Sequence, residues 1–341
     1  MTALAMGTKA GNNTENTLQL TGIHHVSSLS ARIAVSHNFY TDVLGLRLLL
    51  KTVNQDDVSM YHLFFGDGVG SPGSDMTIFD LPRAAQERRG NKSISLTTFR
   101  ISGAAAMRYW AHRLASMGVS VKEPYERAGR QVLDFDDPVG TALSLVDDGG
   151  LGEAFPWQDS PVPADHQIRG LGYVMITVPE REPTERFLTE ALGLRHTGSY
   201  KVSDEKGAEH WNGIYSMGAG GAAAEVHVAV RPDLERSRYG SGGVHHLALR
   251  LAPGNSMAAW VERLNSLGYE NRGVVDRHYF TSTYVREPGG VMFELATDGP
   301  GFEVDAPIDG ERLSLPPFLE GRRGEIEAGL KPIVMEEQGQ P

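Results

Sequence analysis

The stretch FYTDVLGLR at residues 39–47 returns as FLTEALGLR at residues 187–195, 148 positions further along the chain. A second pair, WAHRLASMG at residues 110–118 and WVERLNSLG at residues 260–268, is separated by 150 positions. Self-similarity at a nearly constant spacing indicates a supersecondary unit that is used more than once. The two pairs alternate along the chain, so we expect four related modules arranged in two similar halves.

Around the first repeat the residue pattern predicts one strand, one helix and three further strands. An apolar segment at residues 22–29 is typical of a strand, and Val35, Phe39 and Val43 follow at helical spacing as a buried stripe. Gly45 then ends the helix, because glycine tolerates the left-handed conformation found after helix ends. The remaining strands of this βαβββ module are expected at residues 46–53, 61–66 and 75–81.

The other modules are expected at about residues 92–148, 168–231 and 242–298, which gives an α+β fold. One βαβββ unit leaves a sheet face bare and must pair with another, so four units imply two half-barrel cups that could hold ligands. The expected organisation is a disordered leader (1–18), an N-terminal domain of two modules (19–148), a linker (149–167), a C-terminal domain of two modules (168–300) and a C-terminal extension (301–341).

The composition narrows the classes of partner. The 341 residues carry 32 Lys and Arg against 43 Asp and Glu, a formal charge of −11. We expect no nucleic-acid partner, because phosphates would meet a repulsive field. The sequence has neither an apolar run of membrane-spanning length nor a secretory signal, so a cytoplasmic protein without a membrane partner is expected. Exposed sheet edges leave homo-oligomer formation open.

Two His-His pairs stand at the same phase of the first and fourth modules, in GIHHV at residues 22–26 and GVHHL at residues 243–247. The second His of each pair is His25 or His246, and the corresponding slots of the other two modules hold Tyr173 and Leu96. Because repeats share a scaffold, residues that differ between equivalent slots are the informative ones. The histidines therefore mark modules one and four as the chemically active pair.

A carboxylate completes this set. Glu294 ends the apolar run VMFE in the fourth module, and Ser144 occupies its slot in the second. The chain has no cysteine, so a metal here must be bound by His and carboxylate groups. Two imidazoles and one carboxylate are the facial set typical of non-haem Fe(II), and Mn(II) or Zn(II) could take the same ligands. Buried hydrogen-bonded histidines without a metal are the structural alternative.

Strand geometry leaves open which His of each pair faces the metal. Adjacent strand residues point to opposite faces of a sheet, so a regular strand would bring only one member of a pair to the site. A bulge or a strand end would let both approach it.

The chain resembles the vicinal oxygen chelate superfamily, and within it the hydroquinone-type ring-cleaving dioxygenases. Besides the GIHHV segment, the resemblance rests on KTVNQDD (51–57), YHLFFGD (61–67), GSPG (70–73), DRHYFTSTYVREPGGVMFE (276–294), ATDGPGF (296–302) and LPPFLEGRR (315–323). It covers the chain from residue 22 to about residue 332. In this family the second His of each pair and the Glu bind Fe(II), which implies a metal bound by His25, His246 and Glu294.

The resemblance also implies catalytic residues around the metal. His24 and His245 would lie directly behind the ligands, Tyr284 would reach a substrate oxygen, and Arg277 would lie near the substrate. Tyr284 could instead be an ordinary half-buried strand residue and Arg277 a solvated loop charge. Lesser candidates are Ser27, where some relatives have Thr, and His62 and His278, whereas His210 and His227 are expected in the cup without a metal.

The function implied is Fe(II)-dependent insertion of O₂ into the ring of a hydroquinone-type para-diol. Catechol cleavage is one alternative, since only the resemblance favours the para-diol. A glyoxalase-like isomerase or lyase on Zn(II) or Ni(II) is another, although such chemistry commonly uses a second carboxylate and the first-module strand offers Ile78 there. A cup that merely sequesters an aromatic ligand is a third.

Overall fold

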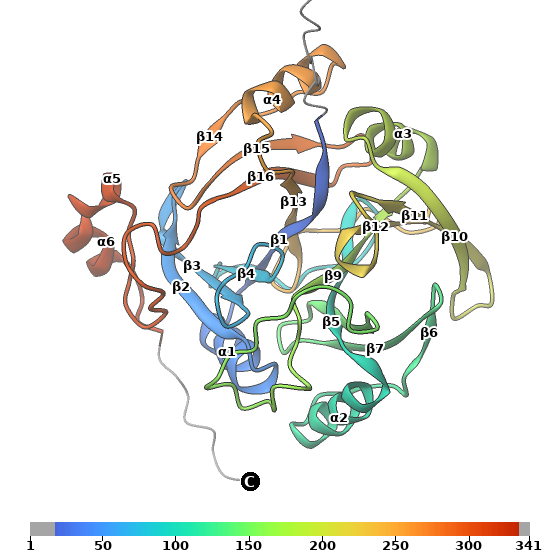
Figure 1. Cartoon of the computed structure of the whole chain (residues 1–341), viewed down its shortest axis with the longest axis horizontal. Helices are drawn as coiled ribbons and strands as arrows, with labels where there is room; N and C mark the ends of the chain where they lie inside the picture. The colour runs from blue at the N-terminus through green and yellow to red at the C-terminus, as the bar shows by residue number, and fades with distance from the viewer. Residues whose placement is uncertain (1–17, 334–341) are drawn as a thin grey trace, which may run out of the picture.

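The computed structural model describes residues 18–333, and these residues form two eight-stranded sheets (Figure 1). Residues 1–17 of the expected leader (1–18) and residues 334–341 of the C-terminal extension lie outside the described residues. Modules one and two contain β1 Leu20–Ser30, α1 Ile33–Asn38, β2 Arg47–Asn54, β3 Asp57–Gly66, β4 Asp75–Asp80, β5 Ser93–Ile101, α2 Gly103–Ser116, β6 Tyr125–Arg127, β7 Arg130–Asp136 and β8 Ala142–Asp147. Modules three and four contain β9 Leu171–Val178, α3 Arg181–Arg186, β10 Arg195–Ser203, β11 Glu209–Ser216, β12 Glu225–Val230, β13 Val244–Leu251, α4 Met257–Ser266, β14 Val275–Asp276, β15 Phe280–Arg286 and β16 Met292–Pro300.

Each module is one strand, one helix and three strands, so the predicted α+β fold of four βαβββ units in two half-barrel cups is confirmed. The first helix differs in detail from the prediction. It ends at Asn38 and continues as a π-helical turn over Phe39–Val43, and the same turn recurs at Phe187–Ala191. Gly45 has φ +70°, the left-handed conformation expected of the helix stop.

The sheets combine modules from different halves of the chain. One has the strand order β14-β15-β16-β13-β1-β4-β3-β2 and unites modules four and one, and the other, β10-β11-β12-β9-β5-β8-β7-β6, unites three and two. The blue and orange strands of Figure 1 share the first sheet, and the teal and yellow-green strands share the second. The halves expected as domains, residues 19–148 and 168–300, therefore each contribute one module to each cup.

Within each half, the two modules are tied together through their helices. Arg113 of α2 donates hydrogen bonds to the carbonyls of Asp42 and Val43, at the end of the first module's helical segment. Arg263 of α4 binds the carbonyls of Glu190 and Ala191 in the same way. Carbonyls at a helix end have no partner within the helix, so these guanidinium groups satisfy them. Both arginines belong to the second sequence repeat and both carbonyl pairs to the first.

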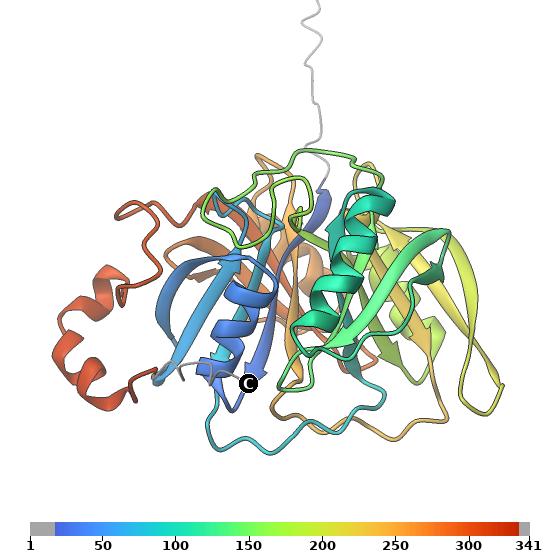
Figure 2. The same cartoon turned by 90° about the horizontal axis from the view of Figure 1, so that it is seen from below.

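Residues 148–170, which include the expected linker at 149–167, contain no helix or strand and cross between the halves. The described part of the C-terminal extension forms α5 Pro317–Glu320 and α6 Arg323–Gly329, which stand beside β2 and β3 (Figure 2). Their apolar side chains pack with Val53 of β2. Among the described residues, no helix is long and apolar enough to cross a membrane.

Candidate metal centre

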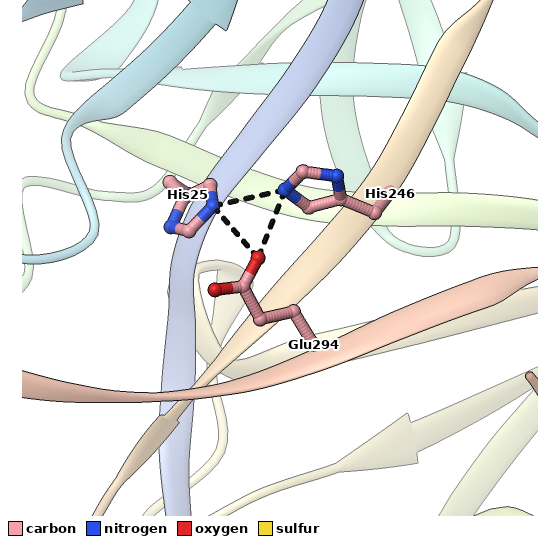
Figure 3. A group of neighbouring side chains, drawn as sticks. All are labelled: His25, His246 and Glu294. Carbon is pink, nitrogen blue, oxygen red and sulfur yellow. Dashed lines mark hydrogen bonds and ion pairs between the residues drawn. The ribbon is translucent and has the colours of Figure 1, made fainter. Parts of the chain in front are cut away.

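Three side chains from adjacent strands converge in the sheet of modules one and four (Figure 3). His25 lies on β1, His246 on β13 and Glu294 on β16, and all are buried. The Nε2 atoms of the two histidines are 3.1 Å apart, and Oε2 of Glu294 lies 3.3 Å from the first and 3.0 Å from the second. The structure therefore brings together the three residues that the resemblance implied as ligands.

Irregular strand pairing places both members of each His-His pair at this site. The register between β1 and β13 shifts at Ile23/His25 and again at Ser27/Ser28, where His245 is the additional residue on β13. Such bulges bend a strand and redirect its side chains. As a result, His24 and His25 touch each other instead of pointing to opposite faces, with 2.9 Å between their Nδ1 atoms.

A chain of hydrogen bonds defines which nitrogen of His25 faces the centre. Nε2 of His24 lies 3.2 Å from the carbonyl of Thr297, which can only accept, so this nitrogen carries a hydrogen. Nδ1 of His24 is then an acceptor, and Nδ1–H of His25 donates to it. Nε2 of His25 is left with a free lone pair directed at the other two ligands, as a metal-binding imidazole requires.

The second pair has the same arrangement. His245 and His246 are 2.8 Å apart at their Nδ1 atoms, and a metal-binding Nε2 on His246 requires its Nδ1–H to donate to His245. His245 then carries its hydrogen on Nε2. Because His245 lines a cavity in front of the ligands, that N–H is available to a molecule bound there.

The ionisation states suit a cation. Burial lowers the pKa of His24 and of His245 to about 3, assisted by the neighbouring His25 and His246 respectively, so both stay neutral. Burial opposes a charge on Glu294, but the two ligand histidines outweigh it and hold its pKa well below the usual range. Glu294 is therefore ionised, so the centre offers a carboxylate beside two imidazoles.

The geometry also fits a metal ion. Both carboxylate oxygens of Glu294 are buried and accept no hydrogen bond from the described residues. An unsatisfied buried carboxylate is costly, and lone pairs this close repel each other unless a cation lies among them. Atoms bound at about 2.1 Å from one ion and at right angles to each other lie about 3 Å apart, close to the separations found here.

A cavity of about 580 Å³ opens in front of His25 and His246. Its walls are mainly apolar or aromatic. The charged groups in its lining, Asp56, Arg272 and Arg277, pair with each other at 3.0–3.2 Å. Both guanidinium groups share the single Asp56 carboxylate, so this wall carries one net positive charge while the rest of the lining is mainly uncharged.

Tyr284 and Arg277, for which the resemblance implied roles at the substrate, both line this cavity. The Nε of Arg277 donates to the Tyr284 hydroxyl at 3.2 Å, and its guanidinium lies over the tyrosine ring. Burial, together with the Glu294 carboxylate, raises the pKa of Tyr284 above its usual range. Tyr284 therefore remains protonated and can donate its hydrogen. Asp56 lies in the hairpin between β2 and β3 and accepts a hydrogen bond from Arg277. The sequence analysis did not single out Asp56, because it is one of two adjacent aspartates in an acidic turn.

Of the lesser sequence candidates, the structure places His62 and Ser27 near the cavity and the ligands, and His278 away from them. His62 lines the cavity and bonds to Thr77, which bonds to Ser27, whose hydroxyl lies 2.9 Å from Nε2 of His246. Thr77 was missed because it lies in a strand, β4, that carries no motif. His278 is outside the cavity lining and pairs with Asp305.

The second cup has an ion-pair network at the equivalent place. His227 stacks on Tyr173, accepts a hydrogen bond from Tyr200 and donates to Glu225. Glu225 also binds Arg130 through two hydrogen bonds of 2.6 and 2.8 Å. Arg130 and His227 thus take up the carboxylate of Glu225 at this place.

His210, also expected in this cup, forms a group with Asp204 and Asp233. The guanidinium of Arg231 contacts both carboxylates, at 3.9 Å from Asp204 and 2.7 Å from Asp233.

Substitution Glu225→Gln is expected to destabilise the fold in a pH-dependent way. Burial opposes ionisation of Glu225, but hydrogen bonds from His227 and Arg130 outweigh it and lower its pKa from 4.5 to about 2. Its stabilising contribution is present above pH 4.5 and is lost as the pH falls toward 2. Chemical denaturation should show the variant about 2 kcal/mol less stable at pH 7, with a smaller difference at pH 3. An equal difference at both values would contradict this account.

The comparisons with known proteins agree with this geometry. The family model described as Glyoxalase/Bleomycin resistance protein/Dioxygenase superfamily matches residues 22–145 and 170–295. The chain is 44% identical to the Bacillus subtilis protein named "Putative ring-cleaving dioxygenase MhqA", over 93% of this chain and all of the relative. It is 30% identical to a chlorohydroquinone/hydroquinone 1,2-dioxygenase of Sphingobium indicum, over 92% of this chain and 97% of the relative.

Solved structures show the same fold. A Bacillus subtilis structure titled as a putative dioxygenase superposes with a TM-score of 0.83 at 34% identity, covering 94% of this chain and all of the other. Glyoxalase I of Zea mays reaches a TM-score of 0.60 at 15% identity, covering 81% of this chain and 92% of the other, which shows a shared fold alone. Because the family model matches both halves and full-length relatives share more than 30% of their residues with it, the chain belongs to the glyoxalase/bleomycin resistance protein/dioxygenase superfamily.

Proposed function

We propose that the protein is an Fe(II)-dependent dioxygenase that cleaves the ring of a hydroquinone-type para-diol. The observation that carries the proposal is that the His25, His246 and Glu294 group opens onto a cavity whose walls are mainly apolar or aromatic. Three protein ligands leave other coordination positions free for reactants. The similarity to ring-cleaving and hydroquinone dioxygenases supports the choice of chemistry. Mn(II) would fit the same donors.

When bound, Fe(II) would hold the substrate oxygen and O₂ next to each other and relay electron density between them. The residues of the chain do the remaining work. Nε2–H of His245 is available as a hydrogen-bond donor to an oxygen in the cavity. The hydroxyl of Tyr284, oriented by Arg277, is a second donor from another wall. The Thr297 carbonyl and His24 keep His25 in the tautomer whose Nε2 can bind the metal.

The ligand group distinguishes this proposal from a glyoxalase-like activity, which commonly uses a second carboxylate. It contains a single carboxylate among the described residues. A neutral aromatic diol needs only apolar contact and a few hydrogen-bond donors.

Oxygen uptake tests the proposal. The protein, purified without oxygen and loaded with Fe(II), is expected to consume one O₂ per hydroquinone and to form a ring-opened product, with much slower uptake on catechol. The Glu294→Ala variant is the control for uptake that does not depend on the centre. Uptake with catechol alone would transfer the proposal to extradiol cleavage. No uptake with either diol, together with stoichiometric Zn(II) or Ni(II) in the purified protein, would overturn it.

A further inference from the structure

The cavity continues well beyond the metal centre along β1. This strand pairs with β4 without interruption from His25 opposite Asp75 to Ser30 opposite Asp80. Residues two apart on a strand share a face, so His25 and Leu29 point into the same cavity. Four residues at about 3.3 Å each place Leu29 about 13 Å along β1 from His25, and about 7 Å beyond Ser27, which pairs with the other ligand, His246. A single benzene ring with its hydroxyl groups does not span the distance from His25 to Leu29.

The far part of the cavity is apolar. We call it the end lobe and define it by Leu29, Met60, Leu81, Ala84, Ala85 and Tyr239. Leu29 is 6% exposed and forms its buried wall, whereas Tyr239 is 52% exposed and stands at its rim. His62 of β3 pairs with Phe79 of the antiparallel strand β4. Two residues further along each strand, Met60 therefore lies opposite Leu81. None of the six side chains bears a charge, so the lobe offers an apolar group little besides hydrophobic contact.

The size of the cavity supports the same conclusion. Its volume of about 580 Å³ lies within the range of about 300–1000 Å³ found for sites that hold ligands much larger than one ring. Ring-sized contacts are already provided beside His25 by Phe280 and beside His62 by Phe64. If an unsubstituted hydroquinone bound there, water would fill the end lobe, and contact between water and the apolar walls is unfavourable.

We propose that the substrate is a neutral para-diol whose ring carries an apolar substituent of several carbon atoms, and that the end lobe binds this substituent. The inference rests on the proposed function for the diol, whereas the lobe itself is argued from the lining alone. Hydrophobic burial strengthens binding about fourfold for each methylene group. Affinity should therefore rise with the length of an alkyl substituent until the lobe is full.

Two series of compounds test this inference. Binding is measured calorimetrically without oxygen, using phenol, 2-methylphenol and 2-butylphenol, which lack the para hydroxyl group and cannot be cleaved as para-diols. Turnover is measured as oxygen uptake with hydroquinone, methylhydroquinone and butylhydroquinone. We expect at least a tenfold gain from the methyl to the butyl compound in affinity and in kcat/KM.

A variant that fills the end lobe tests whether the gain from the butyl group arises in this lobe. Ala84 is partly exposed and lies in a turn after β4, so the larger side chain of Ala84→Phe can be accommodated while it occupies the lobe. In this variant, the ratio of the butyl to the methyl compound, in affinity and in kcat/KM, should fall at least tenfold. Ala105→Phe, on the exposed face of α2 in the other cup, should keep the wild-type ratio.

The outcomes separate the inference from the proposed function. Butyl compounds that bind and turn over no better than methyl compounds would overturn the lobe while leaving ring cleavage intact. If no diol consumed oxygen but phenol affinity still rose with chain length and fell in Ala84→Phe, the proposed function would fail and the lobe would stand. A gain unaffected by Ala84→Phe would also overturn the inference.

Discussion

The Glu294→Ala variant is expected to retain less than a tenth of the iron that the wild-type protein binds under the same loading conditions, and His25→Ala and His246→Ala are expected to behave alike. Each residue contributes one of three converging donor atoms, at 3.0–3.3 Å from the other two. Loss of a group that merely orients a ligand costs about 10- to 100-fold in metal affinity, so loss of a ligand should cost at least as much. Metal analysis after gel filtration measures the effect.

A histidine in the second cup provides the matched control. His227 is buried like His25 and His246 but belongs to the ion-pair network around Glu225. The His227→Ala variant should bind iron as the wild type does, provided that circular dichroism shows both to be folded. Full iron content in all three ligand variants would rule out the proposed metal centre.

The Tyr284→Phe variant is expected to keep its metal and to lose about 100-fold or more in kcat. General acid–base groups typically contribute about 10²- to 10⁴-fold, and burial together with the Glu294 carboxylate raises the pKa of Tyr284, so that its hydroxyl remains a donor. The substitution removes one oxygen and leaves the ring, which packs against His246. Oxygen uptake under saturating diol, with metal content measured on the same sample, gives the result.

Tyr125→Phe is the control for this variant. The Tyr125 hydroxyl donates a hydrogen bond to Asp134 in the second cup, whereas Tyr284 bonds to Arg277 in the first. Tyr125 lies on β6, which belongs to the sheet that does not contain the metal centre. Its kcat should equal that of the wild type. An unchanged kcat in Tyr284→Phe would remove this hydroxyl from the reaction.

Local patterns predicted the modules well. The apolar period of residues 22–29, the helical spacing that follows and the glycine at position 45 act within a few residues of each other, and such signals depend little on the rest of the fold. The π-helical turn at Phe39–Val43 was not predictable in this way, because the apolar spacing there is also that of an ordinary helix.

The candidate ligand residues could be found because repetition supplied an internal comparison. The His-His pairs and Glu294 stand out against Tyr173, Leu96 and Ser144 in the equivalent modules, and the family resemblance selected His25 and His246 within the pairs. No comparison between equivalent modules singled out Asp56. Its importance depends on the packing of a hairpin from module one against arginines of module four, more than 200 residues away in sequence.

The sequence by itself determined the four βαβββ modules, the candidate ligands and the absence of thiolate chemistry, because each depends on residue type and short-range spacing. The tertiary structure decided which modules share a sheet, how bulges bring both histidines of each pair to one site, and where the cavity ends. These features arise from strand register and hydrogen bonds between distant segments. Similar apolar strands could pair in several ways by pattern alone, so only packing of the whole chain selects among them.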